Sequence, residues 1–116
     1  MAARFFSAVL LFACAGAACA HRPTVQECRE ASEFIRNAAL SRDNGMSREA
    51  FVGQLNADLI AIRAHPPALR WFVQDLEDEA FLVSQVEYVF AVPADPVDHE
   101  MRMLRSCLAR LGARIS

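Results

Sequence analysis

The chain has 116 residues, of which 54% are hydrophobic, and it carries 14 acidic residues against 12 basic residues that are all arginine. A chain of this length forms one small domain with a modest core. The first 20 residues hold one arginine and no acidic residue, so the remainder has a formal charge of 11 − 14 = −3. This mild acidity argues against nucleic acid or an anionic membrane as the main partner.

Residues 1–20 have the three parts of a secretory signal peptide: one early basic residue, an apolar stretch, and small residues before a cleavage site. We predict cleavage after Ala20, which leaves a single mature domain of residues 21–116. The apolar stretch, 5–13, is too short to cross about 30 Å of hydrocarbon, which needs about 20 helical residues. We therefore expect a periplasmic or secreted protein with no stable membrane span.

Two cysteines of the leader leave an alternative open. Residues 11–14 loosely resemble a bacterial lipobox that ends in Cys14, and residues 16–19, which end in Cys19, resemble one more weakly. Lipidation at either cysteine would anchor the protein to a membrane. We expect the free form, and a diacylglyceryl mass on the first residue would identify the lipoprotein.

Cys28 and Cys107 bracket almost everything that follows the leader. Because exported proteins fold in an oxidising compartment, we predict that these two cysteines form a disulfide. Catalytic dithiols usually stand in a C-x-x-C motif, whereas these cysteines are far apart in the sequence, which favours a structural role. Closing a loop of about 80 residues stabilises the native state by about 4–5 kcal/mol in the chain-entropy model.

Helical periodicity and capping residues predict an all-α fold with four helices. The first, residues 24–43, begins with a capping box at Thr24 and ends before Gly45. The second begins after Ser47 and ends at His65, before two prolines. Their apolar stripes are Cys28, Ala31, Ile35, Ala38 and Ala39 in the first, and Phe51, Val52, Leu55, Leu59 and Ile62 in the second.

The third segment, about 67–92, is expected to be helical, and an acidic run near its middle favours a bend or a break. The segment therefore forms either one helix or two, and the sequence leaves both alternatives open. Its apolar positions are Leu69, Phe72, Val73, Leu76, Ala80, Val83 and Val86.

Asp95 and Pro96 predict the start of a fourth helix, which we expect to end at Gly112. Its apolar stripe is Val97, Met101, Leu104, Leu108 and Leu111. Four amphipathic helices with short turns fold most simply as a small antiparallel bundle. When successive helices of the bundle alternate in direction, Cys28 and Cys107 lie at the same end of the bundle, as a disulfide requires.

The residues after the double proline are the best candidates for binding a partner protein. Arg70 and Trp71 are of types enriched at interfaces, and we expect Trp71 to be exposed while Phe72 joins the core. An acidic run adds charge for a cation or a basic partner, unless it is only a solvated helix face. Its residues are Asp75, Glu77, Asp78 and Glu79. Asp75 and Glu79 are one turn apart, but no pocket is predicted that would make them an acid/base pair.

Copper binding is a further alternative. After cleavage, the amine and imidazole of His21 would suit copper, with His65 or His99 as a third nitrogen ligand. His99 and Met103, one helical turn apart, offer another pair of ligands, whereas Met101 is predicted to enter the core. The chain has no nucleophile motif, phosphate loop or zinc helix, so we expect no enzyme and no cofactor.

The segment 28–45, CREASEFIRNAALSRDNG, is followed by a capped MSREAF helix and a closing cysteine. This arrangement resembles small exported two-cysteine helical proteins of proteobacteria. The resemblance covers nearly all of the mature chain and implies an architecture but no activity. Looser likenesses exist to acid-stress periplasmic chaperones, whose Lys-rich tail is missing here, and to periplasmic immunity proteins against type VI secretion amidases, whose motifs are missing.

Three functional hypotheses follow. The first is a non-enzymatic exported module that binds a protein partner, for example as an immunity protein. The second is an acid-stress chaperone that exposes its apolar stripes when its carboxylates are protonated. The third is a copper-binding periplasmic protein.

Overall fold

The computed structural model describes residues 23–115, and the side chains of residues 23–110. This part of the chain has no strand and consists of helices joined by short turns. They are α2 (Val25–Asp43), α3 (Arg48–Arg63), the 3-10 turn η2 (Pro67–Leu69), α4 (Leu76–Ala91) and α5 (Pro96–Ile115). The predicted signal peptide, 1–20, lies outside the described residues with Cys14, Cys19 and His21. Among the described helices, none is both long enough and apolar enough to cross a membrane.

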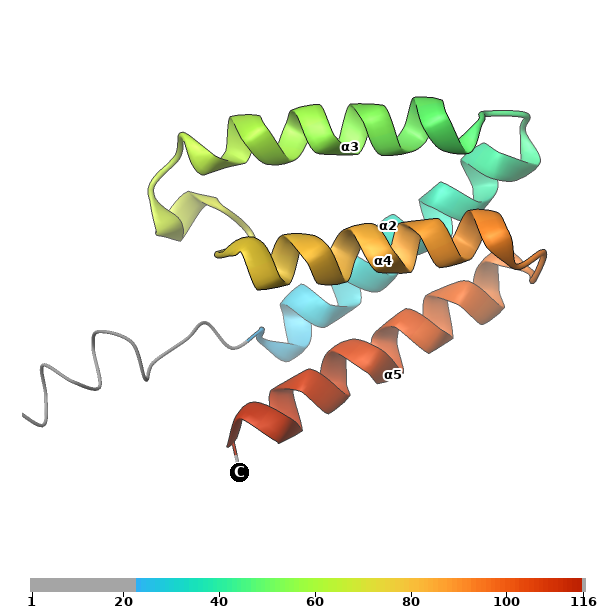
Figure 1. Cartoon of the computed structure of the whole chain (residues 1–116). Coiled ribbons are helices and arrows are strands. Elements are labelled where there is room, and N and C mark those ends of the chain that lie inside the picture. Colours follow the sequence, from blue (N-terminus) through green and yellow to red (C-terminus); the bar gives the residue numbers. More distant parts are fainter. Residues whose placement is uncertain (1–22, 116) are drawn as a thin grey trace, which may run out of the picture.

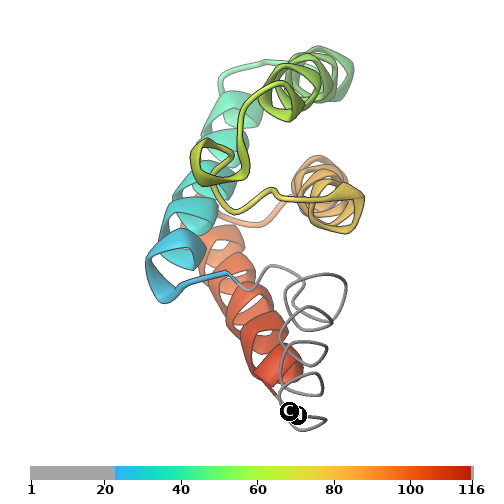
Figure 2. The ribbon, with the colours of Figure 1, turned by 90° about the vertical axis from the view of Figure 1, so that its left-hand side faces the viewer.

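Successive α-helices run in opposite directions across the molecule (Figure 1). In this view α3 lies above α4, α2 crosses behind α4, and α5 lies below. Seen end-on, α2 extends along one side from α3 to α5, and α4 lies on the other side (Figure 2). The most extensive helix contact joins α2 to α5, and α4 packs against both α2 and α3. The prediction of an all-α chain with four α-helices is confirmed for the described residues.

The α2–α5 seam is the contact face between these two helices, and it is closed by the predicted cysteine pair. The sulfur atoms of Cys28 and Cys107 lie 2.08 Å apart, at disulfide distance, and their Cα atoms are 5.5 Å apart. On α2 the buried apolar positions are mostly small, as the predicted stripe required, and each is fully shielded from solvent. They are Cys28, Ala31, Ile35, Ala38 and Ala39, and the polar Ser32 is buried as well. Small side chains let two helix backbones approach closely, which explains why this pair packs most tightly.

The predicted caps of α2 and α3 are confirmed. The Thr24 hydroxyl accepts a hydrogen bond from the Glu27 amide at 3.0 Å, and the Glu27 carboxylate accepts one from the Thr24 amide at 2.9 Å. Gly45 has a φ of 97°, a conformation that favours glycine, and it turns the chain after α2. The Ser47 hydroxyl then accepts from the Ala50 amide at 3.0 Å and starts α3.

Arg42, in the last turn of α2, fixes the turn between α4 and α5. Its guanidinium donates to three backbone carbonyls, those of Val89 at 2.8 Å, Val92 at 3.0 Å and Ala94 at 2.8 Å. These carbonyls lie at the end of α4 and in the turn after it, so they have no helical partner of their own. The arginine therefore supplies donors to this turn, in which the Val92 carbonyl also accepts from the backbone amide of Ala94 at 2.8 Å.

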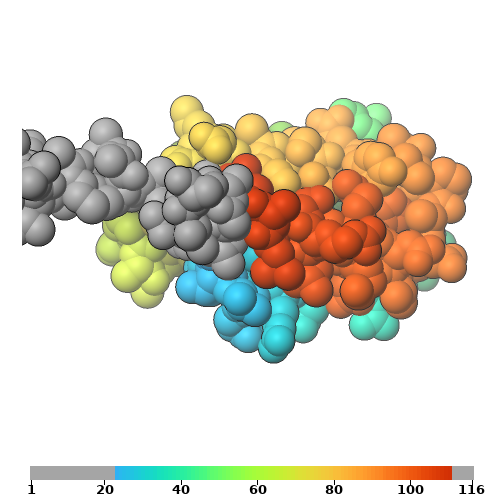
Figure 3. All heavy atoms as spheres, turned by 90° about the horizontal axis from the view of Figure 1, so that it is seen from below, coloured from blue at the N-terminus to red at the C-terminus, as the bar shows by residue number. Residues whose placement is uncertain are grey.

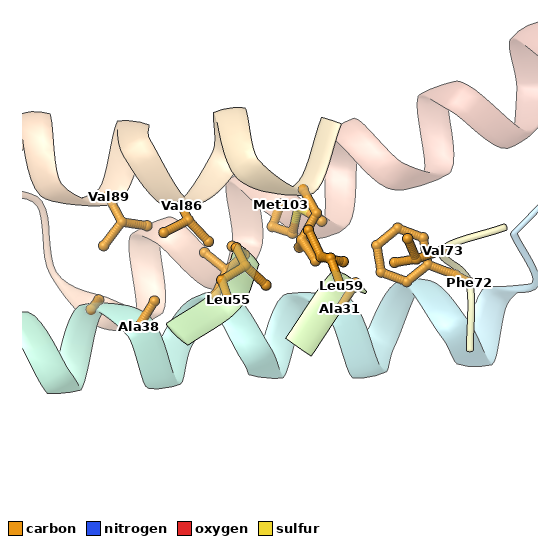
Figure 4. Close-up of a cluster of buried hydrophobic side chains, with 12 residues drawn as sticks. Ala31, Ala38, Leu55, Leu59, Phe72, Val73, Val86, Val89 and Met103 are labelled. Carbon is orange, nitrogen blue, oxygen red and sulfur yellow. The ribbon is translucent and has the colours of Figure 1, made fainter. Parts of the chain in front are cut away.

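One apolar core joins all four α-helices (Figure 4). Leu55 and Leu59 of α3 face Val86 and Val89 of α4 across it, and Met103 enters from α5. Phe72 and Val73 fill the end near the start of α2. The side chains of Phe72 and Val73 are each 2% exposed, although the segment that carries them is not helical.

The break that was favoured in the segment 67–92 is present, directly before most of the acidic run, and only the second half of the segment is α-helical. The chain forms the 3-10 turn, passes through an irregular segment, 70–75, and enters α4 at Leu76. The carboxylate of Asp75 accepts from the Asp78 amide at 2.8 Å and so caps α4. Leu69 and Leu76, which were assigned to an apolar stripe, are 69% and 70% exposed.

The predicted buried face of the fourth helix is also wrong. Among the described side chains of α5, the buried ones are His99, Met103 and Cys107, spaced by four, whereas Met101 is 45% exposed. The disulfide explains the difference, since pairing Cys107 with α2 fixes the rotation of α5 about its axis and turns Val97, Met101 and Leu108 outward. Seen from below, α5 occupies the middle of one face of the molecule (Figure 3). The helix also continues through Gly112 to its end at Ile115.

Candidate functional site

A pocket of about 260 Å³ lies where α3 ends, the segment 70–75 passes and α4 begins. We call it the α3–α4 pocket. Its lining combines charged and apolar side chains, which are Ile62, Arg63, Arg70, Val73, Gln74, Asp75, Leu76 and Glu79. The pocket corrects the expectation that none would lie beside the carboxylates of Asp75 and Glu79.

The segment 70–75 is held in place by its own side chains, which bond to the end of α3 and to the backbone of the segment. Arg70 donates to the carbonyl of His65 at 2.6 Å and to that of Arg63 at 3.1 Å. The side-chain amide of Gln74 donates to the carbonyl of Trp71 at 2.7 Å. Trp71 has a φ of 62°, which costs a residue other than glycine about 1–3 kcal/mol. The surrounding hydrogen bonds offset this strain.

Glu79 is the carboxylate of the pocket with the closest cation. Arg63 donates a hydrogen bond to each of its carboxylate oxygens, from Nη2 to one and from Nε to the other, the latter at 2.8 Å. This hydrogen bond and the charge of Arg63 hold the pKa of Glu79 below its ordinary value, against a smaller opposing effect of burial. Glu79 is therefore a stable anion at neutral pH, and not a carboxyl group suited to donate a proton.

Asp78 has a structural place that the sequence did not indicate. Its side chain is buried, although it belongs to the acidic run that was interpreted as a possible solvated face. One carboxylate oxygen accepts from Arg110 of α5 at 2.9 Å, and the other accepts from the backbone amide of Gln74 at 3.0 Å. Asp78 thereby ties the start of α4 both to α5 and to the segment 70–75.

The structure brings together only some of the residues that were predicted to bind a partner. Arg70, Asp75 and Glu79 line the α3–α4 pocket. Glu77 lies outside it, with an exposed side chain 3.8 Å from Arg110. Trp71 also lies outside the pocket.

Trp71 was expected to be exposed, and the structure corrects this, because the ring is half-buried. Its indole nitrogen donates to Glu30 of α2 at 3.0 Å. The indole lies with its ring centroid 4.5 Å from that of Phe72 and 6.1 Å from that of Phe34. Trp71 is therefore a packing residue that closes the core against α2.

Sequence reasoning missed Arg63 and Leu76 as members of the site. Arg63 was missed because its partner Glu79 lies 16 residues away, beyond any helical spacing. Leu76 was missed because it fits a helical stripe that begins at Leu69, and only the break at 70–75 turns it to solvent. The acidic run was the available signal for that break.

The pair proposed for copper lies in the core. His99 Nε2 is 2.9 Å from the carbonyl oxygen of Val92 and 3.4 Å from Nη1 of Arg42. A metal ion at this nitrogen would have to displace the first contact and approach the positive charge of the second. Among the described side chains, no three of the His, Cys, Asp and Glu residues gather closely enough to hold a metal. The other proposed copper ligand, His21, lies outside the described residues.

The chain matches no protein-family model, and neither a curated protein nor a solved structure is significantly similar to it. Its geometry alone therefore carries the functional argument.

Proposed function

We propose that this chain is a non-enzymatic exported protein that binds a protein partner at the α3–α4 pocket. The observation that carries the proposal is the strained Trp71 backbone in the segment that shapes this pocket. Backbone strain of this kind gathers at binding and active sites. Immunity to an exported toxin is one version of this function.

The surroundings of the pocket fit a protein partner. Leu69 and Leu76 are about 70% exposed on either side of the irregular segment 70–75, and apolar anchors beside charged groups are typical of protein interfaces. The pocket itself offers both Arg70 and the carboxylate of Asp75. We expect a partner that inserts an apolar side chain next to Leu76 and pairs its own charged groups with Arg70 and Asp75.

Substitution of the two exposed leucines tests this proposal. Leu69→Ser and Leu76→Ser should leave the fold intact, since both side chains are exposed, and should weaken capture of the partner from a periplasmic extract at least about tenfold. The matched control is Leu40→Ser, at an exposed leucine that lies on α2 and outside the pocket. Equal capture by all three variants, or capture that only Leu40→Ser weakens, would contradict the proposal.

Export and the finer fold belong to the same proposal. We expect the protein to reach the periplasm, to begin at His21 after cleavage, and to form an antiparallel four-helix bundle stapled by its disulfide. N-terminal sequencing and intact mass of the exported protein test the first two points. A start at Cys14 or Cys19 with an added lipid would replace free export by membrane anchoring. Spin-label distances between the ends of α2, α3, α4 and α5 test the bundle.

A specific observation supports acid-stress chaperoning as a second candidate. Two carboxylates of the first turns of α4 hold it to its neighbours, Asp78 through Arg110 and Glu79 through Arg63. Protonation of both would release the start of α4 and expose the core beneath it. Binding of a hydrophobic dye and suppression of aggregation that switch on near pH 3 would favour this candidate over the first.

A further inference from the structure

Two arginines of α5 stack on two aromatic rings of α4 at matching positions. The guanidinium carbon of Arg110 lies 4.3 Å from the ring centroid of Phe81, and that of Arg102 lies 3.6 Å from the ring centroid of Tyr88. The rings are seven residues apart on one helix and the arginines eight apart on the other, so each site is about two turns from its counterpart. The two sites invite comparison because they share the same cation–π contact.

Only one of the two sites contains its own carboxylate. Asp78, three residues before Phe81, accepts from Arg110 at 2.9 Å. Three residues before Tyr88 stands Gln85, which is uncharged. The Arg110 site is therefore complete within the chain, whereas the residue at the corresponding sequence position of the Arg102 site carries no negative charge.

Arg102 lacks hydrogen-bond acceptors as well as a counter-charge. Its Nε and Nη2 are buried, and no described residue accepts a hydrogen bond from either; Oε1 of Gln85 is likewise buried and receives no hydrogen bond from a described residue. Burial lowers the pKa of Arg102, and the nearby positive charge of Arg105 lowers it further, against the effect of Tyr88. Buried donors without acceptors cost about 1–3 kcal/mol each, more when charged, so this site is under-satisfied as it stands.

Arg102 also lines a cavity of about 270 Å³, which we call the α5 cavity. Arg105, Tyr88 and His99 line it too, together with Asp98 as its one acidic residue. The charged lining thus sums to two arginines minus one aspartate, a net charge of +1 with His99 neutral. A cavity of this size suits a small group, below the range of drug-sized ligands.

We propose that the α5 cavity binds a ligand with a single carboxylate, which Arg102 and Arg105 hold. A carboxylate in the cavity would give Arg102 and Arg105 the counter-charge that Asp78 gives Arg110, in the planar geometry that guanidinium groups match. The net charge of +1 fits a monoanion better than a phosphate dianion. The carboxylate comes either from a small organic acid or from the C-terminus of a peptide. This inference is independent of the α3–α4 pocket and of the partner proposed there.

Titration of the exported protein with three probes tests the proposal by NMR of the α5 amides. The probes are N-acetylglycine, N-acetyl-Ala-Ala-Ala with a free C-terminus, and the same peptide as an amide. We expect saturable shifts with at least one acid and none with the amide. Similar binding of both acids indicates a small acid, and tenfold tighter binding of the peptide acid indicates a peptide C-terminus; both outcomes support the site.

Two variants locate the binding, and a third serves as control. Arg102→Met should weaken binding at least about tenfold, the loss expected for a charged hydrogen bond. Gln85→Glu places a carboxylate at the position that corresponds to Asp78, and it should weaken binding while raising the melting temperature. Arg36→Met, at an exposed arginine of α2, should bind as the wild type does. Gln85→Glu keeps the proposal testable if Arg102→Met does not fold.

Four results would overturn the inference. They are the absence of a saturable shift with either acid, equal binding of the amide, tighter binding of inorganic phosphate than of both acids, and unchanged binding by folded Arg102→Met. Unchanged binding by Gln85→Glu would equally contradict it where Arg102→Met does not fold.

Discussion

The α2–α5 seam and the segment 70–75 are held by different kinds of interaction. At the seam, α2 buries small apolar side chains such as Ala31 and Ala38, and the bridge of Cys28 and Cys107 joins it to α5. The segment 70–75 instead depends on polar hydrogen bonds: Asp78 accepts from its backbone at Gln74, and Arg70 ties it to the carbonyl of His65 just after α3. The comparison teaches that rigidity comes from the seam, while the shape of the α3–α4 pocket depends on hydrogen bonds that pH and substitution can alter.

Loss of the bridge should have the largest effect. The double variant Cys28→Ser/Cys107→Ser opens a loop of 79 residues and should lose about 4–5 kcal/mol of unfolding free energy. For a domain of this size that corresponds to more than about 15 °C in melting temperature. Thermal unfolding followed by circular dichroism measures it, with the reduced wild type as a control. A shift of one or two degrees would show that the seam does not need its bridge.

Loss of Asp78 should have the next largest effect, and it acts on the other region. Asp78→Asn leaves Arg110 without its counter-charge and weakens the hold on the Gln74 amide, so we expect a loss of about 3 kcal/mol. Urea unfolding measures the change. Glu77→Gln, one residue earlier and exposed, is the matched control and should cost far less. Equal losses in both variants would mean that burial of Asp78 carries no special weight.

Arg42→Met should destabilise the protein by about 2 kcal/mol, because three carbonyls of the α4–α5 turn lose a charged donor. Arg42→Lys should recover only part of this loss, since one ammonium group does not match the fork of a guanidinium. Hydrogen exchange of the amides at 92–99 locates the effect. Wild-type stability in both variants would show that water replaces the arginine without cost.

The smallest effect should be that of the pair of Arg63 and Glu79, in which the arginine is exposed. The pKa of Glu79 lies below its ordinary value of 4.5, so folding favours the charged carboxylate. Its contribution is present above about pH 4.5 and is lost as the pH falls through the lower pKa of the folded state. Glu79→Gln should therefore be slightly less stable than the wild type at pH 7 and equally stable at pH 2. Salt should reduce the difference at pH 7. A difference that grows on acidification would contradict this assignment.

The sequence predicted the α2 side of the seam and its bridge well, but the α5 side and the pocket poorly, and the reasons are physical. Caps and stripes are local patterns, which is why Thr24, Gly45 and the alanines of α2 were assigned correctly. The rotation of α5 is set by a contact 79 residues away, so its apolar stripe pointed the wrong way. The same holds for Arg63 and Glu79, whose pairing follows from a break that composition only suggested. Long-range polar contacts leave no periodic signal.

The position of the bridge has a mechanical consequence. Cys28 stands in the first turn of α2 and Cys107 in the second half of α5, so α3, α4 and most of the other two helices belong to one covalent ring. A force applied to the two ends of the chain would pass from one sulfur to the other. The ring would carry no tension, and its helices would stay folded until the S–S bond itself was cleaved.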